Sequence, residues 1–161
     1  MPQYWIFNVK DDENGEYSRT GTEIYSHRMQ DCFWGLREFT ESRRRTANVA
    51  ALNEGDVVLF YLVGKDGHCF LGTCILASGF TKLRRELIDS LTHKKFLDLD
   101  EGVHLKKESI EKWTNPLSIE RLRGKVSFLP IGENYGSYLQ GSVKSMRKQD
   151  FGTIMCEHQT N

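Results

Sequence analysis

Residues 56–78 read DVVLFYLVGKDGHCFLGTCILAS, and this stretch decides the fold. Two apolar runs, Val57–Val63 and Cys69–Ala77, flank the turn sequence GKDGH, in which Asp66-Gly67 is a strong hairpin signal. The runs are apolar at almost every position, as expected for strands that are buried on both faces. The stretch therefore predicts a β-hairpin inside a curled or barrel-like sheet.

Further signals on both sides of the hairpin complete the pattern. The aromatic and β-branched run YWIFNV, Tyr4–Val9, predicts the first strand. The remaining elements that we predict are short helices within residues 23–31, 46–56, 80–96 and 142–158, and strands within residues 103–113 and 125–131. The sequence therefore predicts an α/β fold, more narrowly α+β, in which residues 1–161 form one domain around a barrel-like sheet.

The composition is typical of a globular protein. Of the 161 residues, 39% are hydrophobic and 27% are charged, with a formal net charge of +0 at pH 7. No apolar run is long enough to span a bilayer, and MPQYWIFNVKDD lacks the basic and apolar regions of a secretory signal. We therefore expect no membrane partner and a cytoplasmic location, or a nuclear one in a eukaryote.

Motifs for catalysis or metal binding do not occur in the sequence. It contains no P-loop, no GxGxxG after a strand, no HExxH and no GxSxG. The five histidines are scattered and the four cysteines form no CxxC pair, so we expect no zinc site and mostly buried, reduced thiols. The acidic clusters within residues 11–13 and 98–101 lie in turn-like sequence, where solvated loops are expected. The sequence thus predicts neither an enzyme nor a cofactor.

Aromatic residues beside glycines are the features that indicate binding. Trp34 precedes Gly35, and GENYGSYLQG, residues 132–141, places Tyr135 and Tyr138 among three glycines. A nucleobase has apolar faces and polar edges, so aromatic side chains can hold it while glycines let the backbone come close. The alternative interpretation is that these aromatic residues only pack in the core.

Several of these segments together resemble a known family. YWIFNV at the start, FWGLR at residues 33–37, LNEGDVVLFYLVGKDGHCFLGTCILAS at residues 52–78 and YGSYLQGSVKSMRKQDFGTIM at residues 135–155 resemble the EVE domain of the PUA-like superfamily. The order of features is also similar to the related YTH domain, and the resemblance covers nearly the whole chain. It implies a curled sheet or barrel of five or six strands, flanked by short helices, with a modified-nucleotide pocket at one end.

The resemblance also implies roles for individual residues. Trp34 becomes a wall of the pocket, and Gly35 and Leu36 supply backbone and apolar contacts. Tyr135 or Tyr138 closes the opposite side, in the loop that also holds Ser137. The residues expected to read the edge of the base at the end of the first strand are Asn8, Val9 and Lys10. The residues expected to contact phosphates are Arg43, Arg44, Arg45, Lys82, Arg84 and Arg85.

Three functions remain open on the sequence alone. The first is a reader of a modified base in DNA or RNA, which takes the base flipped out or single-stranded and works alone or beside a nuclease or a motor. The second is an enzyme that modifies nucleotides or RNA. The third is a protein-interaction module that has kept the fold and lost the ligand. The Trp34-Gly35 segment and the basic residues favour the reader.

Overall fold

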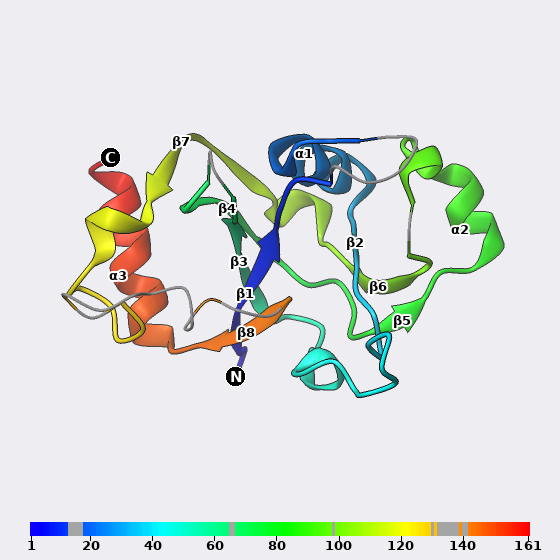
Figure 1. Ribbon diagram of the computed structural model, residues 1–161, viewed down its shortest axis with the longest axis horizontal. Helices are drawn as coiled ribbons and strands as arrows, with labels where there is room; N and C mark the ends of the chain where they lie inside the picture. Colours follow the sequence, from blue (N-terminus) through cyan, green and yellow to red (C-terminus); the bar gives the residue numbers. More distant parts are fainter. Residues whose placement is uncertain (13–17, 65–66, 98, 130, 132–138, 140–141) are drawn as a thin grey trace.

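The computed structural model describes residues 1–12, 18–64, 67–97, 99–129, 131, 139 and 142–161 (Figure 1). Its centre is a five-stranded mixed sheet with the order β7-β4-β3-β1-β8. The strands of this sheet are β1 (Tyr4–Val9), β3 (Val57–Leu62), β4 (Cys69–Ile75), β7 (Glu111–Ser118) and β8 (Val143–Met146). The strands β1 and β3 pair in parallel, whereas the other neighbours are antiparallel.

The predicted hairpin is confirmed as the antiparallel pair β3–β4. Phe60 on β3 belongs to one hydrophobic core, and its neighbours Leu59 and Tyr61 belong to another on the opposite face. Side chains alternate between the two faces of a strand, so a strand covered on both faces is apolar at every position. The continuous apolar run in the sequence therefore reflects a sheet that is enclosed between two cores.

One face of the sheet is covered by α1 (Gly21–Asp31) and a second, three-stranded sheet with the order β2-β6-β5 (Figure 1). The strands of this second sheet are β2 (Phe33–Gly35), β5 (Thr81–Lys82) and β6 (Glu101–His104). Beyond it lies the short α2 (Arg85–Ser90). The sequence did not predict this second sheet, because its strands have only two to four residues.

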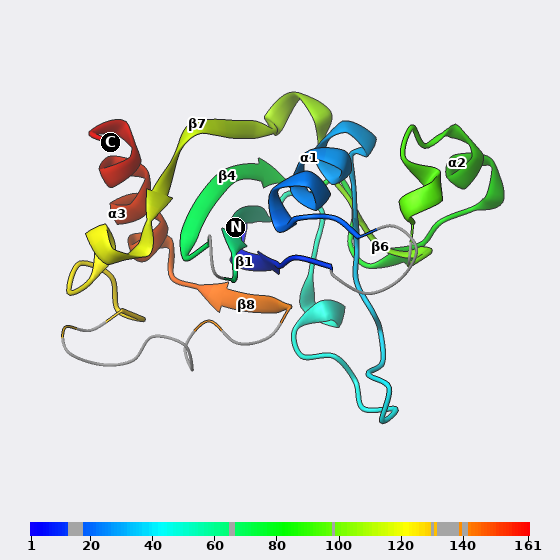
Figure 2. The same ribbon diagram turned by 45° about the horizontal axis from the view of Figure 1, so that its top comes forward.

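The other face is covered by α3 (Lys148–Gln159) and the 3-10 helix η4 (Ile119–Leu122), and Figure 2 shows α3 and α1 on opposite sides of the sheet. Three further 3-10 helices are η1 (Val49–Ala51), η2 (Lys94–Phe96) and η3 (Lys107–Ser109). The predicted α+β class is confirmed, with five strands in the main sheet.

Several predicted elements differ in the structure. Within residues 80–96 only Arg85–Ser90 is α-helical, and none of its residues is buried. Residues 103–113 hold the end of one strand and the start of another, with η3 between them. Residues 142–158 begin with β8 before α3 starts.

The strand predicted within residues 125–131 is wrong for the described residues. The backbone N–H of Lys125 donates to the carbonyl of Leu122, and that of Leu129 donates to the carbonyl of Val126. These bonds close turns, and the three-residue spacing lets both Val126 and Leu129 bury their side chains. Local turns therefore provide the backbone hydrogen bonds and the burial of apolar side chains in this segment, which has no partner strand.

Three further predictions concern membrane spans, metal ligands and cysteines. Within the described residues, no helix is long and apolar enough to cross a membrane. In the described part of the chain, no group of three or more His, Cys, Asp or Glu residues could hold a metal ion. All four cysteines are free, but only Cys74 is buried and Cys156 is exposed, so the expectation of mostly buried thiols is wrong.

Candidate functional site: a cleft at the ends of β1 and β3

An open cleft of about 810 Å³ lies where the parallel strands β1 and β3 end. Crevices at the carboxyl ends of neighbouring parallel strands are frequent ligand sites. Residues of α1, β2 and the loop after β2 complete its walls. The lining residues used below are Asn8, Val9, Lys10, Asp11, Arg19, Arg28, Trp34, Gly35, Leu36, Arg37 and Leu99.

The structure brings together six of the residues that the sequence analysis assigned to a ligand. They come from two segments, 8–10 and 34–36, and all of them line the cleft. The chain runs from β1 through α1 into β2, and α1 contacts both strands. The other three assigned residues, Tyr135, Ser137 and Tyr138, lie outside the described residues.

Trp34 forms part of the cleft wall and is also a core residue. It is only 1% exposed, and its ring centroid lies 4.7 Å from that of Phe60 and 5.9 Å from that of Phe7. The guanidinium carbon of Arg28 lies 4.5 Å from the centroid of the Trp34 ring. The face of the indole is therefore covered by a cation, and the group that the cleft presents above Trp34 is Arg28.

The glycines of β2 and β6 bring the backbone of this wall close together. Gly35 pairs with Gly102, and a Cβ atom on Gly102 would lie 2.0 Å from the carbonyl oxygen of Trp34. A Cβ atom on Gly35 would lie 3.2 Å from the Cβ of Leu99. Glycine at Gly102 is thus required by the neighbouring strand, and Gly35 makes room for the side chain of Leu99.

The arginines predicted to contact phosphates are exposed and do not line the cleft. Arg43, Arg44 and Arg45 lie in a tight turn in which the backbone N–H of Thr40 donates to the carbonyl of Arg44 at 2.7 Å. Thr40 itself lines the cleft, so this turn stands at its rim.

The second group of predicted phosphate contacts lies elsewhere. Lys82 is in β5, Arg84 precedes α2 and Arg85 begins it. Arg85 lies 3.9 Å from Asp89 in an exposed ion pair. None of the three lines the cleft, and their contact with phosphate stays a prediction.

One buried cation in the cleft, Arg19, was not predicted from the sequence. Its exposed fraction is 9%, and reciprocal backbone bonds of 2.8 and 2.9 Å join it to Asp12. The next residue, Thr20, is the N-cap of α1 and forms a capping box with Glu23. Arg19 lies within a polar run that reads as a turn, but the capping-box spacing TxxE would have placed it at the start of the helix.

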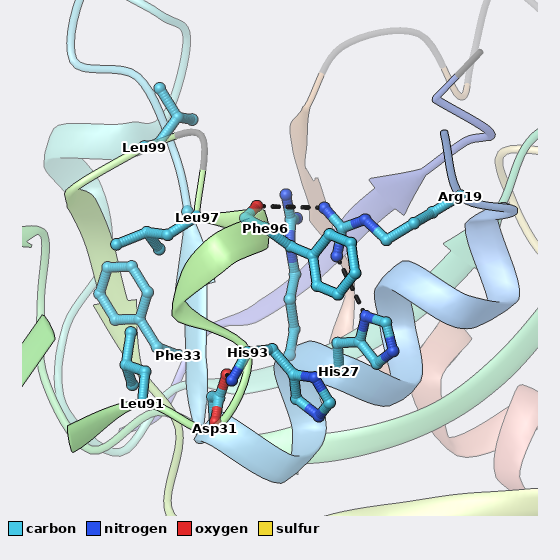
Figure 3. Close-up of a pocket in the computed structure, with 11 residues that line it drawn as sticks. Arg19, His27, Asp31, Phe33, Leu91, His93, Phe96, Leu97 and Leu99 are labelled. Carbon is cyan, nitrogen blue, oxygen red and sulfur yellow. Dashed lines mark hydrogen bonds between the residues drawn. The ribbon is translucent and has the colours of Figure 1, made fainter. Parts of the chain in front are cut away.

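A second, small cavity of about 30 Å³ shares Arg19, Arg28, Gly35 and Leu99 with the cleft (Figure 3). In its wall the His27 ring stacks on His93 and on Phe96, with centroids 4.0 and 5.0 Å apart. Arg19 reaches into this stack, where its Nη1 lies 3.2 Å from His27 Nδ1.

Burial lowers the pKa of His27, and the neighbouring His93 and Arg19 lower it further. A neutral His27 can accept a hydrogen bond through Nδ1, which matches the Arg19 donor at that atom. The small cavity is therefore bordered by two arginines, Arg19 and Arg28, and by a histidine whose pKa is lowered.

Comparison with known proteins supports the fold. No protein-family model matches the sequence, and no curated protein matches it. A hypothetical protein from Leishmania major is 13% identical with a TM-score of 0.62, over 99% of this chain and 96% of that chain. Human THYN1, solved in complex with DNA that contains 5-methylcytosine, is 11% identical with a TM-score of 0.60, over 99% of both chains.

The N-terminal domain of Staphylothermus marinus McrB is 12% identical with a TM-score of 0.50, over 96% of this chain and 94% of that chain. Identities this low establish a shared fold and nothing finer. The PUA-like fold implied by the resemblance to EVE domains is confirmed by these structures.

Proposed function

We propose that this protein binds nucleic acid that carries a modified base, and that the base enters the cleft at the ends of β1 and β3. The observation that carries the proposal is the convergence of residues 8–10 and 34–36 in one cleft. The complex of human THYN1 with DNA that contains 5-methylcytosine supports it, because that protein shares the fold. DNA with 5-methylcytosine is therefore the first ligand to test.

The walls of the cleft suit a flat ring with a small apolar substituent. Val9 and Leu36 are 5% and 3% exposed, and both line the cleft. A methyl group buried against such side chains contributes about 0.8 kcal/mol. The polar edge of the base is proposed to face Asn8 and the backbone around Lys10, at the end of β1.

Arg28 and Trp34 together are proposed as the stacking platform. Guanidinium planes and aromatic rings both stack on bases, and one such partner contributes about 1–3 kcal/mol. Because Arg28 covers the indole, the base either stacks on the guanidinium or displaces it from the ring. In the first case Arg28 contacts the base directly, and in the second it leaves the ring so that the base stacks on Trp34.

Phosphate contacts at the rim would supply affinity that is independent of sequence. Lys10 and Arg37 line the cleft and are exposed, and the turn with Arg43, Arg44 and Arg45 stands beside it. Such contacts make affinity fall as salt rises. A nuclease or motor partner, and a cytoplasmic or nuclear location, stay predictions from the sequence.

The proposal is tested with oligonucleotides at one fixed salt concentration. Single- and double-stranded DNA and RNA that carry 5-methylcytosine, 5-hydroxymethylcytosine or N6-methyladenine are compared with unmodified strands. We expect one modified base to bind more tightly than its unmodified counterpart. Equal binding of all the strands, or no binding, would contradict the proposal.

Two variants locate the site, with one matched control. Trp34→Ala would remove a buried ring and cost about 3–5 kcal/mol of stability, so Trp34→Phe is the better change. Arg28→Ala should weaken binding of the modified strand by about 5- to 150-fold, and Trp34→Phe, which keeps an aromatic ring, should weaken it less. Arg121→Gln, at an exposed arginine of η4 on the opposite face of the sheet, should leave binding unchanged.

The alternative function, an enzyme that modifies the nucleic acid, is tested by the mass of the strand after incubation with the protein. A changed mass would indicate an enzyme.

A further inference from the structure

Arg19 is a buried cation without a carboxylate partner among the described residues. Its Nη1 contacts His27 Nδ1 at 3.2 Å, and its Nη2 donates to the carbonyl of Phe96 at 3.2 Å. The Phe96 ring lies below the guanidinium, with 4.6 Å from Cζ to the ring centroid. A guanidinium has five N–H donors, and these contacts occupy two of them. The Nε atom is buried and has no hydrogen-bond partner among the described residues.

Two carboxylates that line the same cavities as Arg19 already accept backbone N–H groups. Both oxygens of Asp31 accept backbone N–H groups, from Thr92 at 2.8 Å and from His93 at 3.0 Å. Asp11 accepts the backbone N–H of Gly21 at 2.7 Å. Burial of a charge without a partner is costly, so a folded chain keeps one chiefly where a ligand completes it.

The backbone of Arg19 is held in place, and Arg19 lines the ligand cleft. Its backbone is held by the paired bonds to Asp12, directly before the capped start of α1. Arg19 lines both the cleft and the small cavity, as does Arg28, and Figure 3 shows the Arg19 side chain reaching toward His27 and Phe96. An anion at this wall would meet two guanidinium groups from different segments of the chain.

We infer that Arg19 is a phosphate site, which binds a phosphate group of the nucleotide whose base occupies the cleft. The inference rests on the proposed function, because the phosphate belongs to the nucleotide whose base the cleft binds. The buried guanidinium of Arg19 is the group that binds this phosphate. Arginine matches the oxygens of a phosphate with two parallel N–H bonds. The phosphate at Arg19 is distinct from those expected at the exposed arginines, because it lies inside the cleft and next to the base.

The test measures what a phosphate adds to binding. The full chain is titrated calorimetrically with inorganic phosphate, with 5-methyl-deoxycytidine and with its 5′-monophosphate, in one buffer that contains no other multivalent anion. A charge-assisted hydrogen bond predicts that the monophosphate binds about 10- to 150-fold more tightly than the nucleoside. Arg19→Gln should abolish this difference, whereas Arg19→Lys should keep part of it, because the charge stays and the fork is lost. Arg121→Gln serves as the control and should keep the full difference.

A second measurement needs no variant and so does not depend on the folding of Arg19→Gln. In the wild-type chain, the NMR signal of the Arg19 Nε–H group should shift as inorganic phosphate is added. If this signal does not move, or if the nucleoside and the monophosphate bind equally, the inference is wrong. If modified strands are still preferred in that case, the proposed function stands without it. If inorganic phosphate binds at Arg19 but no modified strand is preferred, the anion site stands and the proposed function fails.

Discussion

Asp56 shows how one residue can fix the start of a strand. Its carboxylate is 3% exposed and accepts the backbone N–H groups of Gln3 and Asn53, each at 3.0 Å, and the indole N–H of Trp5 at 2.9 Å. These bonds tie the chain before β1 to the start of β3. The parallel pair on which the cleft depends therefore begins at a buried carboxylate.

Asp56→Ala should lower the free energy of unfolding by roughly 2–4 kcal/mol, because it leaves three donors without an acceptor. Urea denaturation measures the loss. Glu54→Ala is the control at an exposed acidic residue two positions earlier, and it should change stability by less than about 0.5 kcal/mol. A loss for Asp56→Ala no larger than that of the control would contradict this role.

The cysteines should differ sharply in their reactivity. Burial raises the pKa of the Cys74 thiol to about 12, so little thiolate forms at pH 8. Burial also raises the pKa values of Cys32 and Cys69. Cys156, on α3, is exposed.

A thiol reagent at pH 8 should therefore modify one cysteine of the native protein rapidly and all four in denaturant. Cys156→Ser should remove the rapid phase, and its denatured form should show three reactive thiols. A rapid phase that survives this substitution would mean that another cysteine is accessible.

The pairing of strands β2 and β6 depends on Gly102. The strands β2 and β6 approach so closely there that a Cβ atom would meet the Trp34 carbonyl at 2.0 Å and the Gly35 Cα at 2.9 Å. Gly102→Ala should separate the two strands and cost more than about 2 kcal/mol, as overpacked sites do. It should also weaken ligand binding, because the part of the cleft wall that Trp34 forms would move. Thermal unfolding and the oligonucleotide assay measure the two effects.

Gly152 provides the opposite case within α3. No atom lies within 4 Å of a Cβ built there, and the residue is in the interior of the helix. Gly152→Ala should therefore stabilise the protein by about 0.5–1 kcal/mol and leave binding unchanged. Destabilisation by this substitution would show that the glycine has a role that the helix geometry does not explain.

Stability of the whole molecule should depend on pH through two histidines. Burial is the main cause that lowers the pKa values of His27 and His104 below the ordinary 6.5. Between the lowered values and 6.5, the unfolded chain binds more protons than the folded one, so stability rises with pH. The contribution is fully present above pH 6.5 and is lost as the pH falls through the folded-state values.

Urea midpoints at pH 7.5 and pH 5.5 test this dependence. The midpoint should be lower at pH 5.5, and His27→Asn should reduce the difference, because the amide oxygen can still accept from Arg19 but does not titrate. An unchanged difference in His27→Asn would assign the effect to other groups.

Much of the fold could be predicted because the decisive pattern is local. The apolar runs of residues 57–63 and 69–77 predict a hairpin whose strands are buried on both faces. The hydrophobic cores on the two faces of the sheet confirm that interpretation. The short strands β2 and β5 could not be predicted, and β6 was predicted only at its last two residues, because two to four residues give no periodicity and their pairing depends on distant partners. Residues 125–131 misled because turns bury Val126 and Leu129 without a sheet.

The sequence by itself determined the central hairpin and the first strand, because each is a local pattern of residue types. The segments 8–10 and 34–36 became binding candidates through the resemblance to EVE domains. Only the tertiary structure decided that these segments meet at one cleft, that Arg28 covers Trp34, and that Arg19 is buried beside His27 and Phe96. Burial and charge balance are properties of neighbours in space. Arg19 reads as part of a solvated turn until α1 and η2 enclose it, and that enclosure makes its charge a candidate site.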